Sequence, residues 1–576
     1  MKITFTHNAY KSKEGNQQVP PALTHALGCR NEKVAVQLFF QEERGVLTHS
    51  RESLLLPDLT LPIYRVALSC EELKVTGYLE TYLPDDNRVL QADRLANDPY
   101  ITFSENLPGV LWIDVEIPQT FSKKEVTLTA EIYVKTAFQD EVLIENKSIP
   151  IEILPYALPK PQDYTLFLDL WQHSSNVARQ YQVPLWSDDH FNRLEEVVAS
   201  LAQLGQKSVM IVASDCPWCG WGTHIGSKDG TSFYEYSMLH LIKQENGEFI
   251  CDFTTMQRYI DLCAHYNIDA DISLYGLLGV WEMDGFPSIS ITDYPERISV
   301  RYYDEATQTY LYVRNREEYI KYLQLIFEYF KKTGQFEKLY LATDEPKISD
   351  PVKAKQFREV LDILFSIEPN IQLKMAVDQD DVIKEYVEKT KVLAMSFPCT
   401  VSHPEIAKQY PDKRILWYVC NIPDKPNTLF KNHLLEARIL GTLNSLFDLS
   451  GFLRWAYTAW TIEPRQDIRY ETKGFPTGDF SLTYPSKNGK IEVSLRLKQL
   501  EMGIIDFELL AKLKKAGAHS VVEEAYQILQ LDETYTTFMA TKKETREGLY
   551  SLDYLDYQKF RRFIVDALIQ LEKQKS

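Results

Sequence analysis

The first part of the chain, about 155 residues, alternates apolar and polar positions with a period of two, which predicts β-strands. Asp114 and Glu131 alternate with apolar neighbours there, as residues on an exposed sheet face do. Strands at these intervals predict an antiparallel β-sandwich. Residues 157–164, which hold two prolines, are typical of a linker. The segments with the strand pattern are 34–41, 64–73, 110–117, 125–134 and 147–156.

Beyond the linker, strand-like runs alternate with amphipathic helical stretches, which is typical of a parallel sheet. Eight such runs within about 300 residues predict a (β/α)8 TIM barrel. The predicted strands are 164–171, 208–215, 268–276, 338–345, 372–379, 391–399, 415–421 and 451–460. The predicted helices are 188–205, 254–267, 316–334, 350–367 and 429–447.

Residues from about 490 to the end of the chain also have helical periodicity. We therefore predict a multidomain α/β protein in three parts. These are a β-sandwich over 1–157, a TIM barrel over 158–515 and a helical C-terminal extension over 516–576.

Composition and charge exclude several classes of protein. With 44% hydrophobic and 25% charged residues, the 576-residue chain is neither disordered nor of low complexity. A net charge of −18 repels phosphate backbones and anionic lipid, so nucleic acid and membranes are not expected as partners. No apolar run approaches the ~18 residues of a membrane span, and the N-terminus shows no apolar signal segment. We therefore expect a cytoplasmic protein.

Eight scattered cysteines fit reduced thiols, and only Cys216 and Cys219 lie close together in the sequence. Such a pair can be a redox dithiol or half of a zinc site. There is no second pair to complete four ligands, and His224 is a poor substitute. Structural thiols are favoured, and neither a metal nor a cofactor is expected.

In a TIM barrel the active site lies at the carboxyl ends of the strands. Residues at the ends of the predicted strands are mainly carboxylates and aromatic side chains. Carboxylates among aromatic platforms are suited to hydrolysis of glycosidic bonds, which needs an acid and a stabilising negative charge. The candidate residues are Trp171, His173, Asp215, Trp218, Tyr275, Asp344, Glu345, Asp378, Asp380, Ser396, Trp417, Tyr418, Asn421, Trp455, Tyr457 and Trp460.

Asp344 and Glu345 stand out because two adjacent carboxyls end one predicted strand. Their mutual repulsion favours one of them holding a proton, as a general acid must. Neighbouring strand residues normally point to opposite faces, but Pro346 is expected to bias Glu345 toward an extended geometry in which both carboxyls converge. The alternative is a solvated turn before a helix that Asp350 caps.

Six segments follow one another in a characteristic order along the chain: 171–191, 201–212, 343–346, 451–460, 477–486 and 494–510. Together they resemble the catalytic region of glycoside hydrolase family 123, over about residues 160–515. The resemblance implies a retaining exo-β-N-acetylgalactosaminidase with a β-sandwich and a TIM barrel. It also implies catalysis by a neighbouring Asp-Glu pair, with the 2-acetamido group of the substrate as nucleophile.

Carried over to this sequence, the resemblance assigns roles to the strand-end residues. Asp344 would orient the acetamido group and stabilise an oxazolinium intermediate, and Glu345 would be the general acid and then the base. Trp218 and Trp281 are candidates for the aglycone side. Candidates for the acetamido pocket and for hydroxyl binding are Trp417, Tyr418, Trp455, Trp460, Asp378 and Asn421.

Two other functions stay open from the sequence. One is a glycosidase of different sugar specificity, with Glu345 as acid and Asp378 or Asp215 as its partner. The other is a carbohydrate-binding barrel without turnover. In all three cases the expected partner is a carbohydrate, and in the first an amino-sugar glycoside.

Overall fold

Two β-sheets that face each other form the N-terminal part of the protein. The computed structural model describes residues 2–15, 20–41, 43–56, 60–217, 234–278, 300–346, 348–470, 475–531 and 548–575. The first sheet has the order β1 (Lys2–His7), β3 (Glu32–Gln41), β9 (Gly109–Ile117), β6 (Lys74–Pro84) and β7 (Leu90–Ala96). The second has the order β2 (Ala26–Arg30), β11 (Val142–Ala157), β10 (Glu125–Lys135), β5 (Ile63–Ser69), β4 (Gly45–Thr48) and β8 (Ile101–Phe103).

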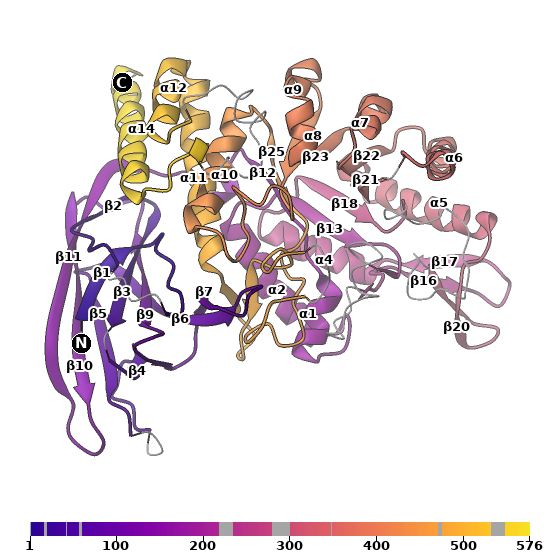
Figure 1. The fold of residues 1–576 in the computed structure, drawn as a ribbon. Helices are drawn as coiled ribbons and strands as arrows, with labels where there is room; N and C mark the ends of the chain where they lie inside the picture. The colour runs from indigo at the N-terminus through magenta and orange to yellow at the C-terminus, as the bar shows by residue number, and fades with distance from the viewer. Residues whose placement is uncertain are drawn as a thin grey trace.

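The period-two pattern places one apolar face of each sheet in a shared core. Leu38 and Leu111 come to this core from the first sheet, and Val66 and Leu128 from the second. The strands of the two sheets pair mostly antiparallel, as predicted. Two pairs are parallel instead, β2 with β11 and β4 with β5. The two layers are indigo to violet in Figure 1.

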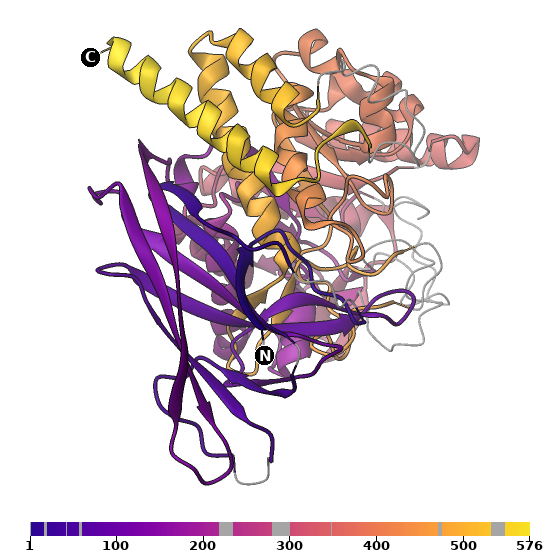
Figure 2. The same ribbon diagram turned by 60° about the vertical axis from the view of Figure 1, so that its left-hand side comes forward.

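The exposed position predicted for Asp114 is wrong, because a helix covers the outer face of the first sheet. Asp114 is buried, accepts a hydrogen bond from Trp112 Nε1 at 2.6 Å and pairs with Lys498 Nζ at 2.9 Å. Lys498 belongs to α11 (Leu495–Lys515), which lies between the N-terminal sheets and the rest of the molecule (Figure 2). The alternation identified the outer face correctly, but it does not show what packs on that face.

Eight parallel strands, in chain order, form the central sheet. They are β12 (Phe167–Leu170), β13 (Ser208–Val212), β18 (Asp271–Tyr275), β21 (Leu339–Asp344), β22 (Gln372–Val377), β23 (Val392–Ser396), β24 (Arg414–Tyr418) and β25 (Gly451–Arg454). β25 also pairs with β12, and a single bridge between Leu168 and Gln206 connects β12 with the start of β13. The sheet is therefore a nearly closed barrel, and the eight predicted strands are confirmed.

Helices connect the barrel strands (Figure 1). They are α1 (Ser174–Tyr181), α2 (Asp188–Gln203), α4 (Thr254–His265), α5 (Arg316–Lys332), α6 (Pro351–Ile367), α7 (Asp380–Tyr386), α8 (Phe397–Ser402), α9 (Ile406–Gln409) and α10 (Leu434–Leu446). Strand β25 ends at Arg454, earlier than predicted, so the candidates from Trp455 onward lie on the loop that follows it.

Three groups of elements accompany the barrel. A four-stranded sheet, which the sequence pattern did not predict, comprises β16 (His240–Lys243), β17 (Phe249–Asp252), β19 (Arg301–Asp304) and β20 (Thr309–Tyr312). Two short pairs are β14 (Cys216–Pro217) with β15 (Tyr234–Glu235) and β26 (Thr483–Pro485) with β27 (Ile491–Val493). After α11 follow α12 (His519–Ile528) and α14 (Tyr554–Lys575).

The C-terminal helices pack against both earlier parts of the chain. α11 crosses α10 so closely that a Cβ on Gly441 would lie 1.8 Å from the carbonyl oxygen of Gly503. Arg562 of α14 donates to Glu152 of β11 at 2.9 Å. Within the described ranges, no helix has the length and apolar content that crossing a membrane requires. The division at residues 157 and 515 stays a prediction.

Candidate active site

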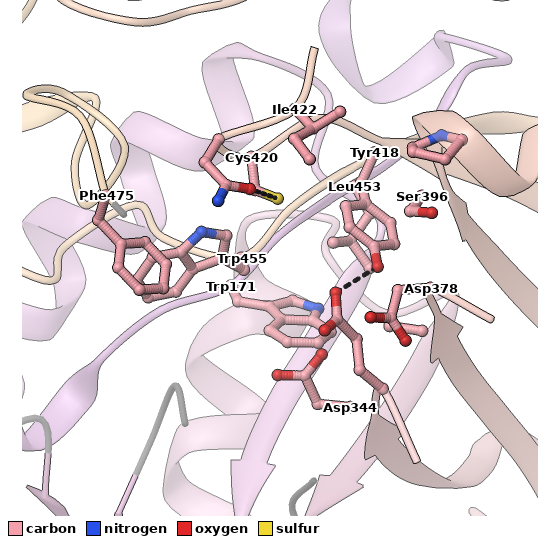
Figure 3. A pocket seen from close by; sticks show the side chains of 14 residues that line it. Trp171, Asp344, Asp378, Ser396, Tyr418, Cys420, Ile422, Leu453, Trp455 and Phe475 are labelled. Atoms are coloured by element: carbon pink, nitrogen blue, oxygen red, sulfur yellow. Dashed lines mark hydrogen bonds between the residues drawn. The ribbon is translucent and has the colours of Figure 1, made fainter. Parts of the chain in front are cut away.

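A cavity of about 360 Å³ opens at the carboxyl ends of the barrel strands (Figure 3). The two predicted catalytic carboxyls line it together with three of the predicted aromatic residues, Trp171, Tyr418 and Trp455. The lining residues are Trp171, Asp344, Glu345, Ala376, Asp378, Ser396, Pro398, Tyr418, Cys420, Asn421, Ile422, Leu453, Trp455 and Phe475.

Asp344 and Glu345 lie side by side at the end of β21, and both side chains are half-buried. The extended geometry predicted for Glu345 is wrong: its φ is +44°, in the left-handed region. Residues other than glycine rarely adopt this region, because it strains the backbone. Such backbone strain is concentrated at functional sites. The left-handed residue breaks the alternation of the strand. Both carboxyls therefore line the same cavity, although the route differs from the one we predicted.

Tyr418 holds the carboxyl of Glu345. Its hydroxyl donates to Glu345 Oε1 at 2.5 Å and lies 3.3 Å from the carbonyl oxygen of Val377. Burial, with the nearby charge of Glu345 as a further cause, raises the pKa of Tyr418 well above its usual value. The hydroxyl therefore keeps its proton and acts as the donor in this pair.

Tyr418→Phe should lower kcat about tenfold to a hundredfold and leave KM within about threefold of wild type. The variant keeps the ring in place but leaves the Glu345 carboxyl without this donor, so the acid loses part of its orientation. Steady-state kinetics on a hydrolysed glycoside would measure both constants. An unchanged kcat would show that the hydroxyl does not position Glu345.

Aromatic rings form one wall of the cavity. Trp171 and Trp455, which were predicted, line the cavity. Phe475, which was not predicted, lines it as well. The Trp455 ring lies 6.5 Å from that of Phe475 in an edge-to-face arrangement. Figure 3 shows these two side chains close together, across the cavity from Asp378. Phe475 lies on a loop without a periodic pattern, so nothing in the local sequence indicated it.

Two predicted residues lie behind this wall and do not line the cavity. The ring of Tyr275 lies 5.9 Å from Trp171, and that of His173 lies 6.0 Å from Trp455. Both side chains are buried, and burial lowers the pKa of His173 to about 3. A neutral imidazole in this place supports the ring of Trp455.

Trp417 and Trp460 do not meet the expectation that they line the acetamido pocket. Trp417 precedes Tyr418 on β24, and because neighbouring strand residues face opposite ways its indole points out of the barrel. There Trp417 Nε1 donates to Asn444 Oδ1 of α10 at 2.8 Å. Trp460 lies beyond the end of β25, is fully buried and donates to the carbonyl oxygen of Thr483 at 2.8 Å.

Asp215 and Asp380 are likewise engaged outside the cavity. Asp215 Oδ2 lies 3.3 Å from Arg301 Nε, and Oδ1 accepts from Ser237 N at 3.0 Å. Burial raises the pKa of Asp215, although Arg301 opposes the shift. Asp380 lies 3.1 Å from His403 Nε2. Of the candidate partners for Glu345 in a conventional carboxylate pair, only Asp378 lines the cavity.

The remaining strand-end candidates divide between the wall and the core. Ser396 lines the cavity and also caps α8, and Asn421 lines it beside Cys420. Tyr457 is buried and contacts Ser200. Trp218, Trp281, Cys219 and the side chain of Cys216 lie outside the described residues. Among the residues that the structure does describe, no three His, Cys, Asp or Glu side chains gather in a way that could hold a metal ion.

Comparisons with known proteins agree with this geometry. The family model described as "Glycoside hydrolase 123, catalytic domain" matches residues 171–513, more than half of the chain. A solved family 123 glycoside hydrolase from Clostridium perfringens, studied for glycolipid glycan hydrolysis, is similar with a TM-score of 0.71 and 15% identity. The similarity covers 99% of each chain, which supports a common fold.

Other solved structures are only distantly similar. A putative β-galactosidase from Bacteroides fragilis has 6% identity over 83% of this chain and 59% of its own, with a TM-score of 0.28. A β-D-glucuronidase from Dictyoglomus thermophilum has 12% identity over 81% and 68%, with a TM-score of 0.30. No curated protein matches the chain. The family match covers seven of the eight barrel strands, both adjacent carboxyls and the aromatic wall, and on that basis the chain belongs to glycoside hydrolase family 123.

Proposed function

We propose that this glycosidase is a retaining, exo-acting β-N-acetylhexosaminidase that favours galactosamine and works by substrate-assisted catalysis. The observation that carries the proposal is the adjacent pair Asp344 and Glu345, which line one cavity with an aromatic wall. A cavity of about 360 Å³ lies at the lower end of the range for small-molecule sites, which suits one terminal sugar.

The proposed first step moves one proton and forms one ring. Glu345 donates a proton to the glycosidic oxygen as the bond from C1 to that oxygen breaks. The carbonyl oxygen of the substrate's 2-acetamido group bonds to C1 and forms an oxazolinium ion, so no protein nucleophile is needed. Asp344 accepts a hydrogen bond from the acetamido N–H, and its negative charge stabilises the cation that develops.

The second step reverses this sequence with water. The Glu345 carboxylate takes a proton from a water molecule, whose oxygen attacks C1 and opens the oxazolinium ring. Two inversions at C1 give net retention. The half-buried positions of both carboxyls limit solvent around the reacting charges, which strengthens their electrostatic effect.

The aromatic wall supplies the binding surface for the sugar. Trp171, Trp455 and Phe475 offer ring faces and edges to the apolar side of a sugar ring and to the acetamido methyl group. Asp378 and Asn421 are the candidates for binding hydroxyl groups. The two candidates for binding the aglycone, Trp218 and Trp281, lie outside the described residues.

A conventional carboxylate mechanism is the second candidate, and the position of Asp378 favours it. This carboxyl lines the same cavity as Glu345, so Glu345 as acid with Asp378 as its partner would hydrolyse sugars without a 2-acetamido group. The two mechanisms differ in what they require of the substrate.

A panel of 4-nitrophenyl β-glycosides with and without the 2-acetamido group separates the two mechanisms. We expect hydrolysis of β-N-acetylgalactosaminide at a kcat/KM at least about a hundredfold above that of β-galactoside, because only the former carries its own nucleophile. A thiazoline analogue of N-acetylgalactosamine should inhibit strongly. Equal rates on both glycosides with no thiazoline inhibition would favour the pair of Glu345 and Asp378.

A further inference from the structure

The cavity wall depends on a loop between β25 and α11. One buried ion pair joins this loop to the barrel strands, because Arg454 of β25 donates to Asp479 Oδ1 at 2.7 Å. This loop carries Phe475, which lines the cavity, and Phe480, whose ring lies 5.0 Å from Trp455 and 5.3 Å from Phe475. Its only described regular structure before α11 is the short pair β26–β27. The position of the wall therefore depends on this pair and on the contacts that the loop makes outside the barrel strands.

A second buried ion pair that holds the loop involves the N-terminal sheets. Asp93 of β7 is fully buried and accepts from Arg496 Nε at 3.0 Å, from Arg496 Nη2 at 2.9 Å and from the hydroxyl of Tyr484. Arg496, at the start of α11, in turn donates to the carbonyl oxygens of Gly478 at 2.9 Å and Ser481 at 3.1 Å. Asp93 thus holds the arginine that holds the loop on both sides of Phe480.

A second contact comes from the turn between β6 and β7. Asp86 Oδ1 accepts from Thr477 N at 2.9 Å and from Thr477 Oγ1 at 2.6 Å, two residues after Phe475. The neighbouring Asp85 shapes this turn, because its Oδ1 accepts from the amides of Asn87 at 2.8 Å and Val89 at 2.9 Å. Figure 2 shows this violet hairpin reaching from the N-terminal sheets toward the barrel loops.

The loop packs closely against the segment at Phe430, where its turn at Gly478 leaves no room for a side chain. Gly478 has a φ of +88°, and a Cβ there would lie 2.7 Å from the amide nitrogen of Phe430. Phe430 N donates to the carbonyl oxygen of Thr477 at 2.9 Å, and Lys11 of the N-terminal part donates to the carbonyl oxygen of Phe430. The loop is therefore held between the hairpin and the segment that precedes α10.

We propose that the β6–β7 hairpin of the N-terminal sheets positions the aromatic wall of the cavity, with Asp86 and Asp93 as positioning residues. The sheets then take part in substrate binding although none of their residues lines the cavity. This proposal rests on the proposed role of the cavity as the sugar site. It does not depend on which glycoside is hydrolysed.

Asp86→Ala tests the proposal, because Asp86 is exposed and its loss should leave the fold intact. The wall binds the sugar alike in the ground state and the transition state. We therefore expect KM to rise about three- to tenfold with kcat within about twofold of wild type. Amide hydrogen exchange at Thr477 should accelerate at least about tenfold, since this amide loses its acceptor. Asp86→Asn, whose Oδ1 still accepts, should restore both values to near wild type.

Glu152→Ala is the matched control. It removes another partly exposed contact between the N-terminal sheets and the C-terminal half, the pair of Glu152 with Arg562, at residues that do not line the cavity. KM should stay at the wild-type value. A wild-type KM in Asp86→Ala, or an equal rise in Glu152→Ala, would overturn the proposal.

Thr477→Val is a second variant that keeps side-chain shape. It removes only the hydroxyl contact to Asp86 and should raise KM by a smaller factor in the same direction. KM is measured with whichever glycoside the wild-type chain hydrolyses. Turnover of sugars without the acetamido group would thus contradict the proposed function but leave the test of the hairpin valid.

Discussion

Glu345→Gln should lower kcat/KM by about 10²- to 10⁴-fold on a glycoside with a poor leaving group, such as an alkyl β-N-acetylgalactosaminide. The amide has the shape of the carboxyl but has no acidic proton to give to the departing oxygen. A 4-nitrophenyl leaving group needs less protonation, so the loss on that substrate should be smaller. Steady-state kinetics on the matched pair of substrates would measure the difference.

Glu337→Gln is the control for this substitution. Glu337 is exposed and lies just before β21, whereas Glu345 lies just after it. The substitution therefore makes the same chemical change away from the cavity. Its rates should equal those of wild type on both substrates. If Glu345→Gln also hydrolysed the alkyl glycoside at the wild-type rate, Glu345 would not be the acid.

Asp344→Asn should lower kcat about 10²- to 10³-fold with only a modest change in KM. The charge of Asp344 acts mainly on the oxazolinium-like transition state, in which positive charge develops, and much less on the neutral substrate. Affinity for a thiazoline analogue of the oxazolinium ion should fall with the rate. Kinetics and inhibition constants on the wild type and the variant would show both effects.

The substrate again supplies the control for Asp344. Any slow turnover of a glycoside without the 2-acetamido group should be far less sensitive to Asp344→Asn, because the group that Asp344 orients is missing. Equal losses of binding and rate on the acetamido substrate would contradict a role confined to the transition state. Equal losses on both classes of glycoside would favour a general structural role for Asp344.

Much of the fold was predictable from local periodicity. The two-residue alternation in 34–41 and 110–117 indicates half-buried strands, and the later runs between amphipathic helices indicate parallel strands. All eight predicted barrel strands are present. The strand ends then led to Asp344 and Glu345, because a parallel barrel gathers the carboxyl ends of its strands at one mouth.

The same rule was less reliable for single side chains near those ends. Trp417 and Tyr418 are adjacent and both aromatic, yet only Tyr418 enters the cavity. They differ because neighbouring residues of a strand point to opposite faces of the sheet. The sequence pattern does not locate the end of a strand to within one residue, so it could not tell which of the two faces the cavity. For Trp455 and Trp460 the strand ends before both of them, and the loop alone places one in the cavity and the other in the core.

The sequence by itself determined the barrel, the N-terminal sheets and the pair of carboxyls at the end of β21, since these depend on local pattern and on general rules of chain topology. Only the tertiary structure decided how the two carboxyls converge, through the positive φ of Glu345, and which rings form the wall. The loop that carries Phe475 is held by two bonds between residues far apart in the chain. They join Asp86 with Thr477, 391 positions apart, and Asp93 with Arg496, 403 positions apart. Contacts over such separations have no periodic signature, because they depend on how complete elements dock against one another.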